Sequence, residues 1–224
     1  MRKFIFQNEK FYHIFNRGVD KRKIFLGESD YIRFLEGMWE FNTIESIDSL
    51  YRLRQLREKE SVATRLLYSS RVATDSARLV DFIAYCLNPN HFHFILKQKK
   101  EDGVSKFMHK VGSGYTHYFN HKNNRSGSLF QGKFKAVEVK SDHQLRYVSA
   151  YINGNPEIHK IEKAKNWKWS SYLDYLGKRN GVLCDKKYVL EYFKNLKEYD
   201  DYTNNVIKES GEIKEEMKKI VFDN

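Results

Sequence analysis

The sequence is short of the residues that build several classes of protein. Of its 224 residues, only two are cysteine and two are proline. Two cysteines exclude a disulfide scaffold and a cysteine zinc cluster, and they suit a reducing cytoplasm. The longest apolar runs cover only a few residues, so no transmembrane helix can be built from them. Residues 1–10 turn polar before a signal-like apolar region develops, so we do not expect export.

The residues that are present describe a globular chain. Aromatic residues make up 15% of the sequence and hydrophobic residues 41%, and the mean hydropathy is -0.71. This composition excludes wholesale disorder, collagen and multi-pass membrane proteins. A chain of 224 residues supports one good core and an appendage, so we expect one compact domain with an extension.

Positive charge is concentrated in the first part of the chain. Forty Lys and Arg against 29 Asp and Glu give a net charge of +11. Residues 178–224 hold ten basic and ten acidic residues, so the whole excess belongs to residues 1–177. This excess indicates a polyanionic partner. Composition alone is equally compatible with a basic surface that serves solubility.

Segments with the apolar periodicity of strands alternate with segments that have the apolar periodicity of helices, which predicts an α+β fold. Apolar residues at period two indicate strands, and apolar residues at helical spacing, such as Ile32, Leu35 and Met38, indicate helices. Asp30 is the expected cap of the first helix. The order β-α-β-β-α-β-α predicts a split βαβ antiparallel sheet with helices on one face. The expected strands are 11–16, 79–87, 91–96 and 136–139, and the expected helices are 29–41, 104–120 and 143–154.

Two regions depart from this pattern. Residues 42–78 are rich in Ser, Thr, Arg and Glu, and we interpret them as a partly helical insertion without chemistry of its own. Residues 178–224 carry apolar positions at helical spacing that predict two amphipathic helices. We therefore divide the chain into a domain over 1–177 and a helical C-terminal extension over 178–224, to which the sequence assigns no role.

The first candidate site is a pair of histidines. His91 and His93 lie on a predicted strand, where the period of two directs both imidazoles to one face and Phe92 to the other. Two neutral imidazoles side by side can chelate a divalent cation. The turn at 88–90 places the pair at the start of its strand, where a coordination position can face solvent. For an isolated pair of this kind, the commoner outcome is a half-buried strand with no metal.

The second candidate is a tyrosine with a metal ligand four residues later, since residues at i and i+4 share a helix face. A His, Asp, Glu, Asn or Gln follows at this spacing only after Tyr12, Tyr51 and Tyr151. Tyr12 lies in a predicted strand and Tyr51 in the insertion, which leaves Tyr151 with Asn155. Pro156 is expected to place Asn155 at the helix end, where partial negative charge favours a cation. The alternative for Tyr151 is an ordinary core tyrosine.

With these residues in place, the sequence resembles the single-tyrosine HUH (His-hydrophobic-His) transposases of bacterial insertion sequences, and most of all the REP-associated tyrosine transposases. The resemblance extends from residue 11 to about residue 177. It rests on separated blocks in the family's order, which are weak singly and highly specific together. The blocks are residues 12–18, 84–94, 125–135, 147–156 and 169–172.

The resemblance implies a ferredoxin-like domain that cleaves and rejoins single-stranded DNA with a hairpin or palindromic element. His91, His93 and Asn155 would hold Mg2+ or Mn2+ on the scissile phosphate. Tyr151 would attack that phosphate, which leaves a 5'-phosphotyrosine link and a free 3'-hydroxyl, and a later 3'-hydroxyl attack would rejoin the strand. The implied protein is a monomer or homodimer of the bacterial cytoplasm and nucleoid, without membrane contact.

A basic and aromatic stretch supplies candidates for DNA contacts. Residues 97–146 contain eleven basic and four acidic residues with aromatic residues between them, which suits single strands because cations meet phosphates and rings stack on bases. Tyr115 and Tyr118 on this stretch lack a ligand four residues later, so we interpret them as packing or stacking residues. Contacts are expected from Asn16, Arg17, Arg125, Lys133 and Lys135. For each of these, a plain solvated surface is an equal alternative.

Three positions depart from the family pattern. Asn88 stands where the family usually has methionine, and Asn153 and Gly154 stand where a histidine and an aliphatic residue are common. A glycine in the last helical turn costs about 1 kcal/mol relative to alanine. We therefore expect Gly154 to loosen the helix that carries Tyr151.

Two other functions are left open by the sequence. A domesticated, non-catalytic binder of single-stranded DNA or RNA would keep the fold and the basic groove. A metallo-hydrolase would use His91 and His93 to activate water, and it would not need Tyr151.

Overall fold

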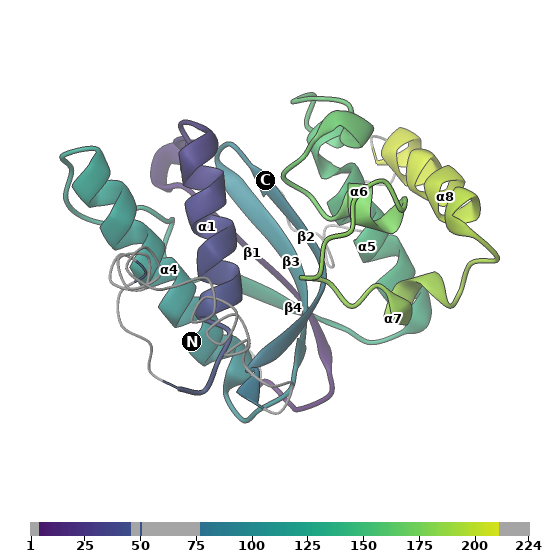
Figure 1. Cartoon of the computed structure of the whole chain (residues 1–224), viewed down its shortest axis with the longest axis horizontal. Coiled ribbons are helices and arrows are strands. Elements are labelled where there is room, and N and C mark those ends of the chain that lie inside the picture. Colours follow the sequence, from purple (N-terminus) through teal and green to yellow (C-terminus); the bar gives the residue numbers. More distant parts are fainter. Residues whose placement is uncertain (1–4, 46–49, 51–76, 211–224) are drawn as a thin grey trace, which may run out of the picture.

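A computed structural model describes residues 5–45, 50 and 77–210 of the chain. Most of the predicted insertion at 42–78 and the second helix predicted for the C-terminal extension lie outside these residues. The described elements form three layers, with one sheet between two helical layers (Figure 1).

The sheet has four antiparallel strands in the order β2-β3-β1-β4. β2 and β3 form a hairpin over Pro89 and Asn90, and β1 lies between β3 and β4. This is the strand order of a ferredoxin-like split βαβ sheet, so the predicted α+β class is confirmed. The strands are β1 (Phe11–Arg17), β2 (Val80–Asn88), β3 (His91–Gln98) and β4 (Lys135–Val139).

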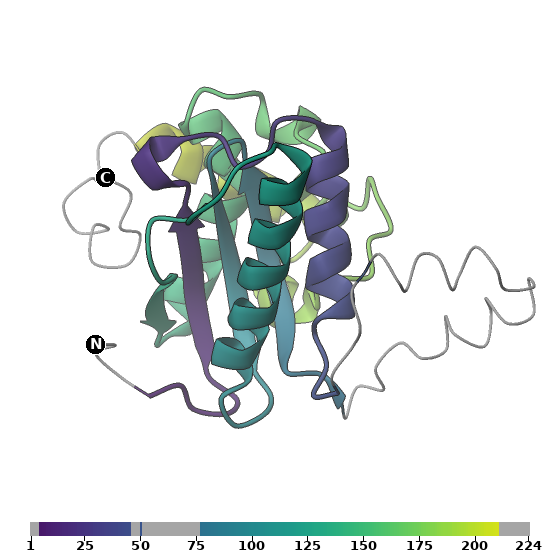
Figure 2. The same ribbon diagram turned by 90° about the vertical axis from the view of Figure 1, so that its left-hand side faces the viewer.

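Helices α1 (Glu28–Glu40) and α4 (Gly103–Lys122) share one face of the sheet (Figure 2). Phe34 of α1 packs against Phe92 and Phe94 of β3, and it meets Tyr115 of α4 edge to face with ring centroids 4.8 Å apart. Aromatic side chains dominate this core because each removes a large apolar area from water.

Two expectations for α1 were wrong. Ile32 is exposed, whereas Met38 is buried as expected and Leu35 packs against the core. The rings of Tyr31 and Phe34 fill the rest of the buried stripe, which turns Ile32 outward. Asp30 is not the cap, because α1 begins after Gly27, and the Asp30 carboxylate accepts hydrogen bonds from the backbone N–H groups of Leu26 and Gly27.

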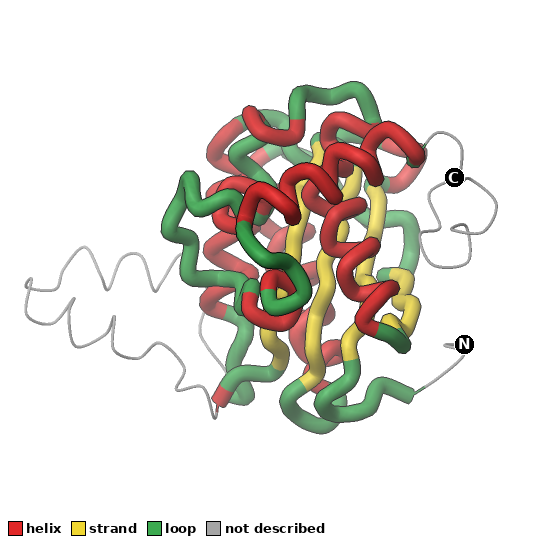
Figure 3. The backbone as a smooth tube through the Cα atoms, turned by 90° about the vertical axis from the view of Figure 1, so that its right-hand side faces the viewer, coloured by secondary structure: helices red, strands yellow, loops and turns green. Residues whose placement is uncertain are grey.

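The opposite face of the sheet is also covered, which corrects the expectation of helices on one face. α5 (Asp142–Ile158) packs on β2 and β3, and α8 (Leu196–Glu209) packs on α5 (Figure 3). Apolar periodicity identified both helices but carried no information on which face they cover. The shorter helical turns are η1 (Val19–Lys21), η3 (Ala164–Asn166), α6 (Tyr172–Tyr175) and α7 (Lys187–Leu190).

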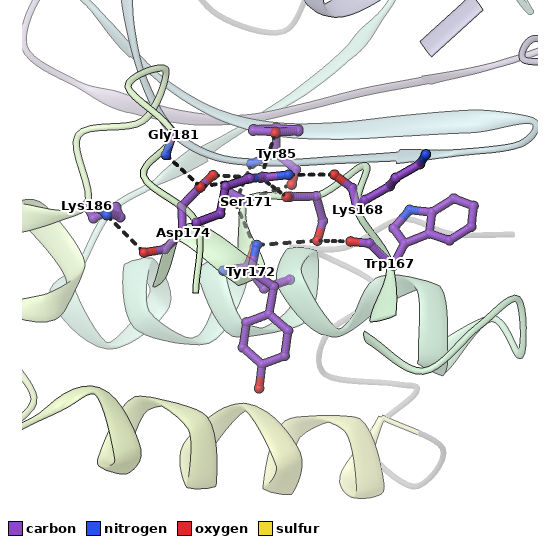
Figure 4. Close-up of polar contacts among 11 residues, drawn as sticks. Tyr85, Trp167, Lys168, Ser171, Tyr172, Asp174, Gly181 and Lys186 are labelled. Carbon is purple, nitrogen blue, oxygen red and sulfur yellow. Dashed lines mark hydrogen bonds and ion pairs between the residues drawn. The ribbon is translucent and has the colours of Figure 1, made fainter. Parts of the chain in front are cut away.

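The chain between α5 and α8 runs along the free edge of β2. Ser171 accepts a hydrogen bond from Tyr85 N through Oγ, and its own N–H donates to Tyr85 O. Arg179 binds the carboxylate of Asp174 with Nε and Nη2 at 2.7 Å each, and Asp174 also accepts from the N–H of Gly181 (Figure 4). This segment satisfies the backbone groups of an edge strand that would otherwise be open to pairing.

Helix α8 fixes the position of α5. Asn153 donates to the hydroxyl of Tyr199 at 2.8 Å and accepts from Ser171 Oγ at 2.7 Å. A Cβ atom on Gly154 would lie 2.6 Å from Cγ1 of Ile207. The glycine therefore permits close approach of the two helices, and the expected loosening of α5 stays a prediction.

Candidate active site

The strand register brings a group of polar and aromatic side chains to one end of the sheet. Arg17 lies opposite His91 and Phe15 lies opposite His93 in the β1–β3 ladder. Residues that are directly opposite project to the same face. Both histidines therefore share a face with the end of β1, and α5 covers that face.

Each histidine of the pair is held through its Nδ1 atom. His91 Nδ1 lies 2.6 Å from Asn90 Oδ1, which can only accept, so His91 donates from Nδ1. His93 Nδ1 lies 3.0 Å from Nε2 of the buried His13. With Nδ1 engaged in this way, the Nε2 atom of each ring is the one available as a ligand.

Asn155 lies on α5 and contacts His91 from the helical layer that covers this face of the sheet. Its Oδ1 lies 3.2 Å from His91 Nε2, and it also accepts a hydrogen bond from Asn88 Nδ2. Pro156 does not end the helix as predicted, because α5 continues to Ile158. Asn155 and Pro156 are both buried, and this tertiary packing overrides the local bias against helix before proline.

Tyr151 lies one helical turn before Asn155 and on the same side of the sheet as the histidines. Its ring meets the His93 ring edge to face, with centroids 6.1 Å apart. The side chain is largely buried, at 6% exposed. The structure thus brings together Tyr151, Asn155, His91 and His93, the four residues that the sequence nominated for catalysis and metal binding.

The rival tyrosines lie on the other side of the sheet. Tyr115 is buried under α1, and its hydroxyl donates to Ile24 O at 2.6 Å. Burial raises the pKa of Tyr115 far above the usual value for a phenol. Tyr118 donates to Asp30 Oδ1 at 3.0 Å. Both therefore serve packing of the α1–α4 layer.

Three of the five expected DNA contacts border the histidine pair. Arg17 pairs with His91 in the β1–β3 ladder, so the two side chains project to the same face of the sheet. The guanidinium of Arg17 donates hydrogen bonds to Gln131 Oε1. Asn16 donates to Gly132 O, which ties the end of β1 to the basic loop. Lys135 lies opposite Phe15 and is exposed, with Nζ 5.9 Å from the Phe15 ring centroid. Arg17 and Lys135 therefore place positive charge beside the pair.

The other two expected contacts lie along the basic loop. Lys133 is exposed on the loop that leads into β4. Arg125 is half-buried, and its guanidinium binds Asn120 Oδ1 and Ser128 O. Arg125 thus stabilises the loop itself, while Lys133 presents its charge to solvent.

Four residues at this site were not identified from sequence. His13, Asn88 and Asn90 contact the nominated ligands as described above, and the ring of the exposed His159 lies 4.9 Å from that of His91. A signal existed for His159, because it follows Asn155 by four residues on the same helix face. His13 could be found only from the β1–β3 register.

The nominated residues fit a hard divalent cation. Among the described residues, no cluster of three or more His, Cys, Asp or Glu could hold a metal ion, so a site here depends on the amide of Asn155. Two imidazole nitrogens and an amide oxygen suit Mg2+ or Mn2+ with positions left for water and phosphate. In the described structure the buried Nδ2 of Asn155 has no hydrogen-bond partner, a condition that a bound ligand would relieve.

Comparison with known proteins agrees with this arrangement. Residues 50–155 match the family described as "Transposase IS200 like". This region of the chain is similar to IS200-like transposases, and it includes His91, His93, Tyr151 and Asn155. No curated protein matches the chain.

One solved structure supports the fold of this chain. A REP-associated tyrosine transposase bound to a REP hairpin matches with a TM-score of 0.52 at 13% identity, over 80% of this chain and 85% of that chain. At this identity the likeness shows the fold. The tRNA(His) guanylyltransferase of Saccharomyces cerevisiae covers 94% of this chain and 81% of its own at 10% identity, but its TM-score of 0.32 carries no argument.

No helix in the described parts of the chain is long and apolar enough to cross a membrane.

Proposed function

We propose that this chain is an IS200-like transposase that cleaves and rejoins single-stranded, hairpin-containing DNA through Tyr151, with Mg2+ or Mn2+ held by His91, His93 and Asn155. The observation that carries the proposal is the edge-to-face contact of Tyr151 with His93, on the face of the sheet where His91 and Asn155 also meet. A nucleophile belongs within reach of the groups that bind the scissile phosphate.

The side chains divide the work of strand transfer. Tyr151 Oη forms a bond to phosphorus as the bond from phosphorus to the 3'-oxygen breaks, so the phenol loses its proton and the 3'-oxygen gains one. When bound, the cation neutralises charge that develops on the phosphate and lowers the pKa of the phenol. Arg17 and Lys135 neutralise neighbouring phosphates, and a later 3'-hydroxyl attack on the phosphotyrosine rejoins the strand.

Hairpin DNA is the proposed partner because the REP-associated relative was solved with a REP hairpin. The basic excess of residues 1–177 and the cations beside the histidine pair suit such a polyanion. The histidines and Tyr151 meet within the single chain described, which is compatible with the proposed monomer or homodimer, and we place the reaction at the bacterial nucleoid.

The direct test is a search for the covalent intermediate. The protein is incubated with labelled single-stranded hairpin DNA and Mg2+ or Mn2+, and protein–DNA adducts that survive SDS are measured. Wild-type protein should form the adduct, and Tyr151→Phe should form none. Tyr147→Phe is the matched control, because Tyr147 lies one turn earlier on α5 and is similarly buried.

The other functions predict different products. A non-catalytic binder would show tight, salt-sensitive DNA binding and no adduct with any variant. A metallo-hydrolase would release a free 5'-phosphate and would keep its activity in Tyr151→Phe. Either result would overturn the tyrosine mechanism.

A further inference from the structure

Asn88 lies at the centre of the candidate metal site. It is the last residue of β2, and its side chain is fully buried. Its amide group lies 2.9 Å from His91 Nε2 and donates to Asn155 Oδ1. No sequence pattern assigns Asn88 a function, and the residue differs from the methionine that is usual in related chains.

The spacing of these three polar groups is that of neighbouring metal ligands. Mg2+ binds its ligands at about 2.1 Å with near-octahedral geometry, so ligands at right angles lie about 3.0 Å apart. The separations of His91 Nε2 from the Asn88 amide and from Asn155 Oδ1 are 2.9 and 3.2 Å. The Asn88 amide and Asn155 Oδ1 therefore each lie at the distance from His91 Nε2 expected of a neighbouring ligand.

The Asn88 amide can present oxygen at the same place. The two ends of a carboxamide have nearly the same shape, and a half-turn about the Cβ–Cγ bond exchanges Oδ1 and Nδ2. Asn88 Oδ1 now accepts a weak hydrogen bond from Cys86 Sγ at 3.5 Å. After the exchange, Nδ2 would face the sulfur, which is a weak acceptor, so the buried amide keeps a partner.

We propose that Asn88 is a fourth protein ligand of the divalent cation, through Oδ1, alongside His91, His93 and Asn155. The inference rests on the proposed function, because it assumes that the cation binds at the histidine pair. A second amide oxygen makes the site harder in chemical character, which favours Mg2+ and Mn2+ over softer metals. It also leaves about two of six positions for water and a phosphate oxygen.

Metal binding without DNA tests this role directly. Full-length protein is titrated with Mn2+, and free Mn2+ is followed by electron paramagnetic resonance. Asn88→Leu should weaken Mn2+ binding by about tenfold or more, because it removes the oxygen ligand. Asn88→Asp should bind Mn2+ at least as tightly as wild type, because a carboxylate is a stronger ligand for this ion.

The aspartate variant separates ligation from hydrogen bonding. If Asn88 serves only as a donor to Asn155 Oδ1, then Asn88→Asp loses the donor, repels that oxygen and weakens Mn2+ binding as Asn88→Leu does. That result, or unchanged binding in Asn88→Leu, overturns the ligand role. Asn88→Met, of similar length and without an amide, repeats the leucine test if Asn88→Leu fails to fold.

Two further variants complete the design. Asn42→Leu removes another buried amide, which bonds to the backbone of Leu79 and Val80 at the opposite end of β2 from Asn88. This change should leave Mn2+ affinity unchanged. His91→Ala should abolish binding. Unchanged binding in His91→Ala would overturn the proposed metal site itself, whereas loss in His91→Ala with none in Asn88→Leu would overturn only the role of Asn88.

Discussion

At the scale of single residues, the neighbours of the histidine pair matter as much as the pair. A ring that binds metal through Nε2 usually donates from Nδ1 to a fixed acceptor, which sets both its tautomer and its orientation. Asn90 supplies that acceptor to His91, and His13 supplies it to His93. His13 is fully buried, so its own ring is held in one place by the packing around it.

Removing the His13 ring should weaken the metal site without removing a ligand. We expect His13→Leu to lower Mn2+ affinity by about 10- to 100-fold, because His93 loses the partner of its Nδ1 atom. His13→Gln offers an amide oxygen as acceptor and should restore part of the affinity. The measurement is the Mn2+ titration described above, with His109→Leu on the exposed side of α4 as the control.

An equal loss of affinity in His13→Leu and His13→Gln would show that His13 acts through packing alone. Thermal unfolding of each variant, followed by circular dichroism, reports that packing contribution separately.

The nominated residues could be found because their spacing is local. A period of two places His91 and His93 on one face, and a spacing of four joins Tyr151 to Asn155. The contacts of His13 with His93 and of Asn88 with Asn155 were beyond reach, because each joins elements distant in sequence. Which of these residues reacts or binds metal is still a prediction.

At the scale of elements, the contact between α5 and α8 decides how firmly Tyr151 is held. Asn153 and Gly154 lie between Tyr151 and Asn155 on α5, and both face α8. The hydroxyl of Tyr199 on α8 also lies 3.3 Å from Ser149 Oγ. Polar contacts and close approach together fix the helix that carries the proposed nucleophile.

A methyl group at position 154 should disturb this contact. Gly154→Ala gains helix propensity, but its Cβ would overlap Ile207, so we expect a net loss of about 1 to 2 kcal/mol in the free energy of unfolding. Gly112→Ala on α4 is the matched control, since nothing lies within 4 Å of its Cβ, and it should gain up to about 1 kcal/mol. Urea unfolding measures both.

The double variant Gly154→Ala with Ile207→Ala assigns the loss to this pair. If the two changes are additive, the clash with Ile207 is not the cause.

Prediction from sequence succeeded for elements and failed for their surroundings. Each of the four strands and each of the three long helices predicted before residue 160 exists, because apolar periodicity depends on local burial. Helix α5 continues through Pro156, because burial of the helix outweighs the local bias of proline. In α1, the aromatic residues Tyr31 and Phe34 are buried and Ile32 is exposed. Layer assignment failed because periodicity shows that a face is buried but not against what.

At the scale of the whole molecule, basic side chains lie at the end of the sheet that carries the histidine pair. The basic loop, the end of β1 and the start of β3 meet there, so Arg17 and Lys135 border the histidine pair. The acidic and basic residues of 178–224 balance, and α8 packs on the outside of α5 (Figure 1). Binding of a polyanion should therefore depend on the first region alone.

The salt dependence of DNA binding tests this division. Arg17→Gln and Lys135→Gln should each lower the slope of log K against log salt concentration by about 0.7 to 1, because each phosphate contact releases counterions. Lys194→Gln in the charge-balanced region should leave the slope unchanged. Fluorescence anisotropy with labelled hairpin DNA at several salt concentrations provides the slopes. Equal effects from all three variants would indicate a diffuse basic surface with no localised groove.

The support of α5 by α8 has a consequence for how related chains diverge. The match to the transposase family ends at residue 155, yet the partners of Asn153 and Gly154 on α8 lie well beyond it. Changes in α8 would therefore alter the position of Tyr151, the proposed nucleophile, from outside the matched region. Two lineages with identical catalytic motifs would then differ in the speed of strand joining because of the helix that braces the tyrosine.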